Sequence, residues 1–174
     1  VCRLYRPRDL PTLLRALRIC LQRLPCRLLI VGDGPDRPQV EAEIGALGLQ
    51  ERALLLGFRD DVRTLLRASD LFVLSTALWE GLPLTVLEAM DAALPVVASR
   101  VGGIVEAVQA GETGLLAPPR NPQALAEALL TLLTDQALAA RMGQAGRRRV
   151  MACFDSARMV AETEALYRRL IAFA

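Results

Sequence analysis

The chain has 174 residues, of which 53% are hydrophobic and 23% charged, and this balance excludes a disordered protein. Its 21 basic residues, all arginine, are nearly matched by 19 acidic ones, so the net charge of +2 does not indicate a nucleic acid partner. The chain has no histidine, so any imidazole base would have to come from another domain or chain.

Four cysteines, Cys2, Cys20, Cys26 and Cys153, show no C-x-x-C spacing. We interpret them as reduced, mostly buried thiols of an intracellular protein rather than as metal ligands. No apolar run reaches the ~18–20 residues of a membrane span and no signal peptide is visible, which predicts a cytoplasmic protein. The chain begins with Val1 in what looks like the end of a strand, and we expect it to be a piece of a longer protein.

Short apolar runs alternate along the chain with segments that have helical spacing of apolar residues. The predicted strands are 1–5, 27–31, 53–56, 71–74, 95–99 and 115–117, and the predicted helices are 12–24, 36–47, 62–68, 83–92, a short one after Gly103, 121–133, 136–151 and 156–170. Because the strands are apolar without alternation, both faces of their sheet should be covered. This predicts a Rossmann-like three-layer αβα sandwich with about six parallel strands. Residues 1–174 should form one domain, which closes with helices over about 136–174.

The stretch from Asp70 to Ala93 organises this pattern, because a strand, a sharp turn and a helix start follow one another there. In parallel α/β proteins such turns bind anionic ligands. Pro83 has no N–H, but the backbone N–H groups of Leu84 and Thr85 begin the helix and can receive a phosphate.

Two glutamates, Glu80 and Glu88, flank this helix start. Fully helical spacing would separate them by a rise of ~12 Å and a rotation of ~80°. A hydrolytic pair of carboxylates stands only ~5–9.5 Å apart around one bond. The two residues are therefore better placed to touch distant parts of one elongated ligand, such as a nucleotide sugar. The alternative is that Glu80 only caps the helix and Glu88 is a surface residue.

The segment E-G-L-P-L-T-V-L-E-A-M, which begins at Glu80, resembles the E-x7-E signature of retaining GT-B glycosyltransferases, especially family 4 (glycosyl transferases group 1). Six further segments stand in that family's order: V-G-D-G-P (31–35), L-G-F-R-D-D-V (56–62), A-S-D-L-F-V-L (68–74), L-P-V-V-A-S (94–99), V-G-G-I-V-E (101–106) and G-E-T-G-L-L (111–116). The resemblance implies the C-terminal, donor-binding half of a GT-B fold, without its N-terminal acceptor domain.

The resemblance also implies roles for single residues. Glu80 would be the catalytic glutamate near the transferred sugar and phosphate, and Glu88 would bind the ribose. The implied donor-binding residues are Arg3 and Arg8 at the diphosphate, Leu84 and Thr85 as main-chain phosphate donors, Phe58 and Arg59 at the base, and in addition Gly32, Gly81 and Leu82. The chain departs from the family at Cys2 and Asp9, where glycines are usual, and an extra carboxylate at Asp9 would repel a diphosphate unless it turns away.

The implied function is transfer of a sugar, with retained configuration, from a UDP- or GDP-linked donor to an acceptor. No cofactor and no metal are implied. The implied partners are the nucleotide sugar and the acceptor domain, through which any peripheral membrane contact would be made; no nucleic acid is implied. The chain alone is expected to be inactive. The alternatives are a non-catalytic nucleotide-binding or scaffolding domain and a GT-B sugar epimerase.

Four other features of the sequence are interpreted as structural rather than catalytic or leave two interpretations open. The pair Asp60 and Asp61 is interpreted as a helix cap rather than a metal site, and 147–149 as a solvated helix face. Trp79 could shield the site or belong to the core. The helix 156–170 is expected to cross to the acceptor domain, as in similar family members, and to expose its apolar face.

Overall fold

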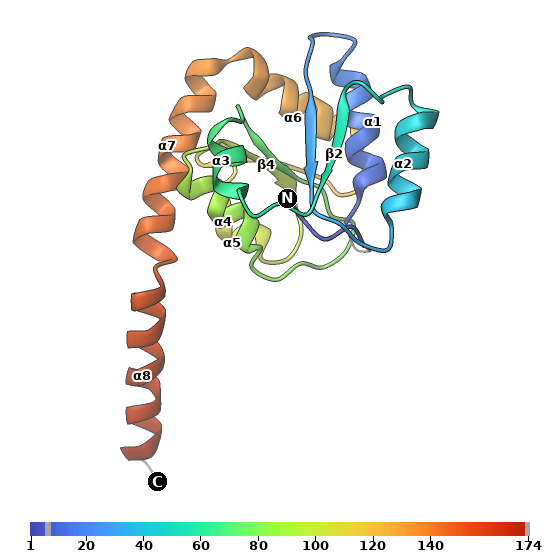
Figure 1. Ribbon diagram of the computed structural model, residues 1–174. Helices are drawn as coiled ribbons and strands as arrows, with labels where there is room; N and C mark the ends of the chain where they lie inside the picture. The colour runs from blue at the N-terminus through green and yellow to red at the C-terminus, as the bar shows by residue number, and fades with distance from the viewer. Residues whose placement is uncertain (6–7, 173–174) are drawn as a thin grey trace.

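The computed structural model describes residues 1–5 and 8–172, in which parallel strands alternate with helices in the predicted order (Figure 1). Its elements are α1 Leu10–Cys20, β1 Leu28–Val31, α2 Arg37–Ala46, β2 Ala53–Gly57, α3 Val62–Arg67, β3 Phe72–Leu74, α4 Leu84–Asp91, β4 Val96–Ser99, α5 Ile104–Ala107, β5 Gly114–Ala117, α6 Pro122–Thr134, α7 Gln136–Cys153 and α8 Ser156–Ala172. The expected α/β architecture is confirmed, and residues 173 and 174 of the predicted closing segment lie outside the described part.

Several helices begin where the sequence places a capping side chain. Asp9 accepts a hydrogen bond from the N–H of Thr12 at 3.3 Å at the start of α1. Asn121 caps α6 and Asp135 caps α7 in the same way, at 2.9 Å and 2.8 Å. A proline follows the cap in α1 and α6, where its missing N–H would have had no acceptor. These short-range signals fix the helix starts.

The strands form two separate parallel sheets, one of β1 and β2 and the other of β3, β4 and β5. The expected count of about six strands is therefore corrected to five within the described residues. The missing one is the first, because Val1–Tyr5 forms no strand. Only Cys2 and Leu4 of this segment donate hydrogen bonds to β1 and the loop after it, at Val31 and Asp33.

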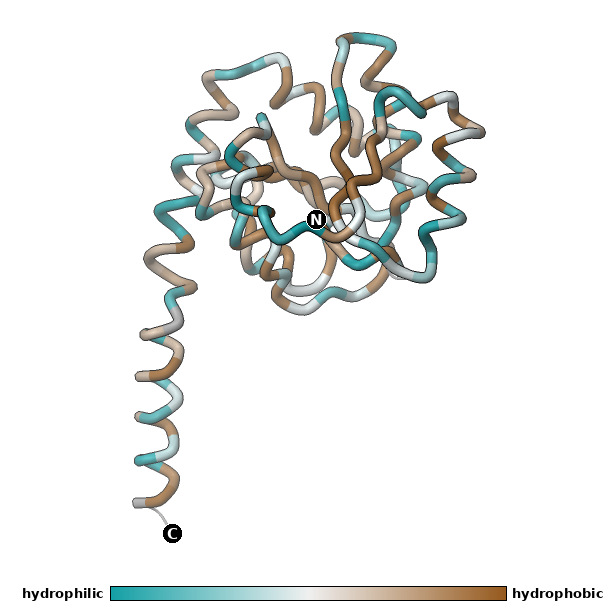
Figure 2. The backbone as a smooth tube through the Cα atoms, viewed as in Figure 1, coloured by the Kyte–Doolittle hydropathy of each residue, from teal (hydrophilic) through white to brown (hydrophobic). Residues whose placement is uncertain are grey.

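Apolar side chains cover both faces of the strands, as expected for a three-layer sandwich. All four residues of β4 are buried; Val97 belongs to a core with α1 and α6, while Val96 and Ala98 belong to a second core with α4 and α5. Alternate residues of a strand point to opposite faces, so the two cores lie on opposite sides of the sheet. Figure 2 shows long apolar stretches in the central strands, while apolar and hydrophilic residues alternate along the helices.

Helix α8 extends away from the rest of the protein (Figure 1). The expectation that its apolar face is exposed is confirmed at Met159, Leu166 and Leu170, whose exposed fractions are 63%, 46% and 58%. No helix in the described part of the chain is both long enough and apolar enough to cross a membrane.

All four cysteines are free thiols, but the prediction that they are mostly buried is wrong. Only Cys20 is fully buried, on the inner face of α1, where its thiol donates to the carbonyl of Ala126. Cys2 and Cys26 are half-buried, and Cys153, the last residue of α7, is exposed. A cysteine's place in a helix or loop, and not its residue type, decides its burial here.

Candidate functional site

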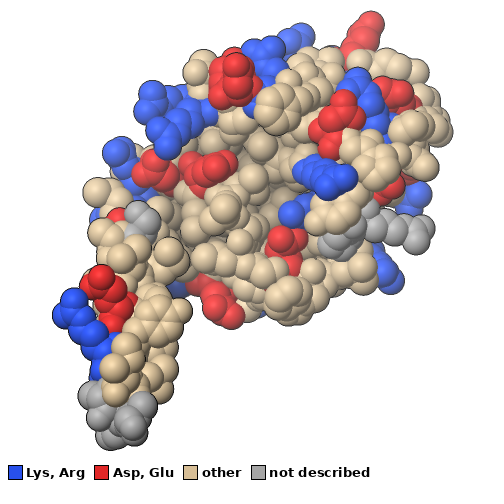
Figure 3. Space-filling view, turned by 60° about the horizontal axis from the view of Figure 1, so that its bottom comes forward, with Lys and Arg blue, Asp and Glu red and all other residues tan. Residues whose placement is uncertain are grey.

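The carboxyl ends of the parallel strands meet at one edge of the molecule, and most predicted site residues follow those ends. Gly32 comes after β1, Phe58 and Arg59 after β2, and Glu80 lies in the loop between β3 and α4. Figure 3, which brings the lower end of Figure 1 forward, shows acidic and basic side chains interspersed on this face. Neither sign of charge forms a continuous patch there, in keeping with the net charge of +2.

Arg8 and Glu80 form an ion pair at the centre of this edge, although they are 72 residues apart in the chain. Nη1 of Arg8 donates to Oε2 of Glu80, and Nη2 donates to Oε1 at 3.3 Å. The exposed fractions of the two side chains are only 13% and 15%, so the pair is largely shielded from solvent. The Nε of Arg8 is buried without a hydrogen-bond partner. An unsatisfied buried donor on a cation is a feature that an anionic ligand would satisfy.

Two glycines hold the backbone of Glu80, and neither was assigned a role from the sequence. The N–H of Gly103 donates to the carbonyl of Glu80 at 2.8 Å. A Cβ at Gly102 would stand 2.0 Å from that same carbonyl oxygen, and a Cβ at Gly103 would stand 2.6 Å from the carbonyl of Gly81. Both glycines therefore allow a close approach of two loops. The adjacent glycines in V-G-G-I-V-E indicate a close backbone approach, but the sequence does not identify the loop that approaches them.

Gly32 and Gly34 play a similar part beside the amino-terminal segment. A Cβ on Gly32 would lie 1.9 Å from the carbonyl of Cys2, and one on Gly34 would lie 2.2 Å from that of Leu4. The two glycines let the first residues of the chain lie against the end of β1. Burial raises the pKa of the Cys2 thiol, and the nearby Arg8 opposes that shift. Cys2 is thus held as a neutral thiol near the ion pair.

Asp9 turns away from the ion pair and caps α1, so the repulsion expected of its carboxylate is relieved in part. Its Oδ1 accepts from Thr12, while its Oδ2 is buried without a partner. Its backbone N–H donates to the carbonyl of Ser75 at 3.2 Å, and its carbonyl accepts from the Ser75 hydroxyl at 2.8 Å. These bonds fasten the segment that carries Arg8 to the end of β3.

Helix α4 begins as predicted at Leu84, directly after Pro83. The N–H groups of Leu84 and Thr85 precede the first intrahelical donors, Val86 and Leu87, which both donate to the carbonyl of Pro83. The start of α4 therefore presents two free N–H groups a few residues after Glu80. This is the arrangement that binds phosphate at helix N-termini. Gly81 and Leu82 form the connecting loop, and Leu82 is exposed.

Glu88 lies in the second turn of α4 and is exposed. It lines a cavity of about 320 Å³ together with Arg63, Arg67, Asp91 and Arg147. Burial lowers the pKa of the Val1 amino group, while the Glu88 carboxylate is close enough to oppose that shift. The structure thus brings Glu88 near the first residue of the chain.

The remaining predicted residues lie at the rim of this edge. Arg3 is exposed and stacks on the ring of Tyr5, with 5.7 Å from its guanidinium carbon to the ring centre. Phe58 is 84% exposed. Arg59 pairs with Asp61 at 2.6 Å, and this contact lowers the pKa of Asp61. The reading of Asp61 as a capping side chain is therefore wrong, because its carboxylate binds Arg59 and makes no hydrogen bond to α3.

The structure also tests the interpretations of Trp79 and of residues 147–149. Trp79 is 79% exposed and so does not belong to the core. Arg147 and Arg148 are exposed as expected, whereas Arg149 donates to the carbonyls of Glu106 and Ala107. Over residues 1–5 and 8–172, no three His, Cys, Asp or Glu side chains gather as a metal site would require.

Comparison with known proteins identifies the family of this chain. Residues 1–135 match the family model described as "Glycosyl transferases group 1". The chain is 37% identical over 141 residues to the N-acetyl-alpha-D-glucosaminyl L-malate synthase of Bacillus anthracis, covering 81% of the chain and 37% of that relative. It is 34% identical over 169 residues to the D-inositol 3-phosphate glycosyltransferase of Corynebacterium glutamicum, covering 92% and 40%.

Two solved structures show the same fold. The sucrose-phosphate synthase of Thermosynechococcus elongatus superposes with a TM-score of 0.91 at 33% identity, over 100% of this chain and 45% of that one. Anabaena HepE in complex with UDP and glucose superposes with a TM-score of 0.87 at 29% identity, over 94% and 46%. The chain thus spans less than half the length of each of these relatives. The family match, the relatives and the fold agree, and the chain belongs to the group 1 glycosyltransferases.

Proposed function

We propose that this chain is the donor-binding half of a retaining GT-B glycosyltransferase of family 4, and that it holds a nucleoside-diphosphate sugar at the edge around Glu80. The observation that carries the proposal is the shielded Arg8–Glu80 pair, with its unsatisfied Nε, next to the free N–H groups at the start of α4. The Arg8 guanidinium and the N–H groups at the start of α4 can together bind a diphosphate, and the adjacent Glu80 carboxylate can accept hydrogen bonds from the hydroxyls of a sugar.

In this proposal the donor lies along the loop from Glu80 to α4. Arg8 and the N–H groups of Leu84 and Thr85 stabilise the negative charge that builds up on the leaving diphosphate. Glu80 orients the sugar and its phosphate, and Glu88 accepts hydrogen bonds from the ribose. Arg3 is the second diphosphate arginine and has to leave the Tyr5 ring to reach it.

The rim of the site completes the proposed donor contacts. Phe58 and Arg59 border the base, while Gly32, Gly81 and Leu82 let the backbone approach the ligand. The donor is UDP- or GDP-linked, and no metal or cofactor is proposed. The relative that was solved with UDP and glucose supports a uridine nucleotide as the first probe.

The acceptor is proposed to bind a separate N-terminal domain that lies outside this chain. The lengths of the relatives support this, since the chain matches less than half of each. That domain would also provide any histidine needed for catalysis, because this chain has none. Any peripheral contact with a membrane is likewise proposed for that domain, and no role is proposed for nucleic acid.

Calorimetric titration of the chain with UDP and GDP tests the donor site. We expect binding of at least one of them, together with a change in the fluorescence of Trp79, the single tryptophan, which neighbours Glu80. Glu88→Gln should weaken binding by about 10-fold, which corresponds to the loss of one charged hydrogen bond. Glu112→Gln, which changes an exposed glutamate on a turn, is the matched control. Absence of binding at millimolar nucleotide, or equal affinity of the two variants, would contradict the proposal.

A further inference from the structure

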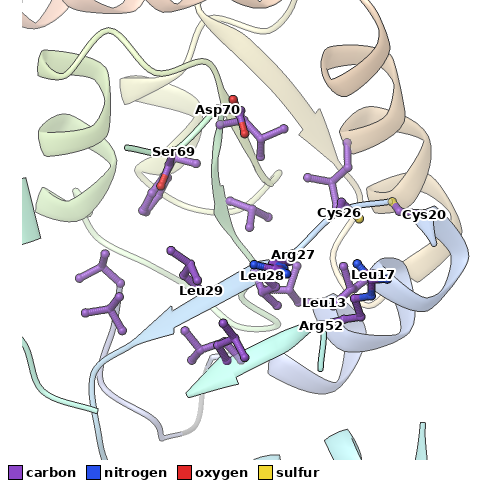
Figure 4. Close-up of a pocket in the computed structure, with 18 of the residues that line it drawn as sticks. Leu13, Leu17, Cys20, Cys26, Arg27, Leu28, Leu29, Arg52, Ser69 and Asp70 are labelled. Carbon is purple, nitrogen blue, oxygen red and sulfur yellow. The ribbon is translucent and has the colours of Figure 1, made fainter. Parts of the chain in front are cut away.

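The loop that carries Glu80 has little backbone support of its own. It follows β3, and on the side of β1 a cavity of about 680 Å³ separates β3 from the other sheet. Figure 4 shows Leu29 of β1 and Asp70, just before β3, on different sides of this cavity. Over residues 77–82, one backbone hydrogen bond reaches another described segment, from the N–H of Gly103 to the carbonyl of Glu80 at 2.8 Å. The residues that hold Gly103 in place therefore hold the backbone of Glu80 as well.

Gly103 is joined to the far end of α5 through a single turn of helix. Its carbonyl accepts hydrogen bonds from the N–H groups of Glu106 and Ala107, at 3.2 Å and 3.1 Å. Ile104 and Ala107 are fully buried in the core with α4. Four residues of helix correspond to a rise of about 6 Å. A displacement of the end of α5 is therefore passed on to Gly103.

Arg149 of α7 fastens that end of α5. Its Nε donates to the carbonyl of Ala107 at 2.9 Å and its Nη2 donates to the carbonyl of Glu106 at 2.7 Å. The last carbonyls of a helix have no donor inside the helix, so a side chain has to supply one. A guanidinium holds its donors in a fixed fork, which the single ammonium of a lysine cannot reproduce. The guanidinium carbon also lies 5.6 Å from the centre of the Phe154 ring, which restricts its rotation further.

The same helix α7 is fixed closely against α4. A Cβ on Gly143 would stand 2.0 Å from the carbonyl oxygen of Ala93, just after α4, and one on Gly146 would stand 3.4 Å from the side chain of Met90. Arg149 follows Gly146 at the same step of three residues, so the three positions lie near one side of α7. Helix α7 therefore contacts α4 through its two glycines and α5 through its arginine.

We propose that Arg149 is a positioning residue of the donor site. By tying the end of α5 to α7, it fixes the backbone of Glu80 relative to α4, whose start presents the free N–H groups of Leu84 and Thr85. Arg149 acts through α5 and not through contact with the ligand. The effect on nucleotide binding rests on the proposed function, whereas the effect on the Glu80 loop rests on the contacts alone.

Amide exchange of the nucleotide-free chain tests the effect on the loop. Arg149→Met removes the guanidinium but keeps an unbranched apolar stem, and Arg148→Met changes the exposed neighbouring arginine as a control. Val97, in the central strand β4, reports global unfolding. We expect the exchange of Gly103, relative to that of Val97, to be at least ~10-fold faster in Arg149→Met than in Arg148→Met. Arg149→Lys should lie between them, because one donor replaces the fork.

Titration with UDP and GDP tests the effect on the site. The nucleotide that binds the unaltered chain should bind Arg149→Met about 10-fold more weakly and Arg148→Met equally well, since a preorganised site is sensitive to small displacements. Asn121→Ala loses the α6 cap, which does not contact α5, and so controls for a general loss of stability. It should change neither the affinity nor the ratio of Gly103 to Val97 exchange.

Two results would each overturn the proposal. One is an exchange ratio in Arg149→Met that equals the ratio in Arg148→Met; the other is an affinity of Arg149→Met that equals the affinity of Asn121→Ala. If Arg149→Met does not fold, Arg149→Lys is measured against the same controls. If the unaltered chain bound neither nucleotide, the proposed function would fail, and the exchange ratio alone would decide whether Arg149 holds the Glu80 loop.

Discussion

Replacing Gly102 by alanine is the sharpest test of how the Glu80 loop is held. Gly102 has a φ of +45°, and its added Cβ would stand 2.0 Å from the carbonyl oxygen of Glu80. Cβ atoms essentially never lie within 3.0 Å of a heavy atom outside their own residue and its two chain neighbours, so the loop that carries Glu80 has to shift by about 1 Å. The hydrogen bond from Gly103 to the same carbonyl must lengthen with it.

A matched control separates this displacement from backbone strain. Gly111 also has a positive φ, of +83°, but an added Cβ there meets nothing within 4 Å. Gly111→Ala should therefore lose only the cost of the left-handed conformation, about 1 kcal/mol of unfolding free energy. Gly102→Ala should lose about 1–3 kcal/mol more, because the overlap and the weakened hydrogen bond add to the strain.

Urea denaturation measures the two stabilities, and titration with UDP or GDP measures the effect on the site. We expect Gly102→Ala to bind nucleotide at least ~10-fold more weakly than Gly111→Ala, since an error of 1 Å is large for a preorganised site. The emission of Trp79, next to Glu80, should also change in the free Gly102→Ala protein. If both variants have the same stability and the same affinity, the close approach of Gly102 to Glu80 does not hold the loop, and the reasoning fails.

Three further predictions concern the ion pair, a buried thiol and a helix cap. Arg8→Met should lower the unfolding free energy by about 3 kcal/mol because it leaves the Glu80 carboxylate shielded and unpaired. The double variant Arg8→Met with Glu80→Gln should lose less unfolding free energy than Arg8→Met alone. A double variant whose loss equals the sum of the two single losses would contradict this. Burial raises the pKa of Cys20 from 9.0 to about 11, so the unfolded chain loses the thiol proton at lower pH than the folded chain does. The stability contributed by the buried neutral thiol is therefore complete below pH 9 and is lost as the pH rises through about 11, at about 1.4 kcal/mol per pH unit. Denaturation of Cys20→Ala should lack this slope, and an unchanged slope would assign it to other groups. Asn121→Ala should lower the unfolding free energy by about 1 kcal/mol through loss of the α6 cap, and an unchanged urea midpoint would show that the cap contributes nothing.

Local patterns in the sequence were sufficient for the alternation of strands and helices and for the start of α4 at Leu84. The cap at Asp9 could also have been found, since an acidic residue followed by a helix with proline in its first turn is a short-range signal. The resemblance of the motifs anticipated the family. Helix starts and caps depend only on residues that are close together in the chain, and for this reason local patterns predict them.

The features that were missed all depend on contacts between distant segments. Arg8 and Glu80 are separated along the chain by three strands, and no spacing rule in the sequence predicts that they pair. The close approach of Gly102 to Glu80 is a meeting of two loops, so the G-G pair is visible in sequence but its partner is not. The first predicted strand failed for the same reason. A strand exists only with a partner along its edge, and among the described residues the bonds of Val1–Tyr5 to other elements reach only the end of β1 and the turn after it, at Asp33 and Asp36.

The amino-terminal segment connects the ends of β1 and β3 to the site. Cys2 and Leu4 bind the end of β1, Asp9 binds the end of β3, and Arg8, directly before Asp9, pairs with Glu80. The position of Arg8 is thus fixed by neighbouring residues that bind the ends of both sheets, so a substitution that weakens those bonds should also loosen the Arg8–Glu80 pair.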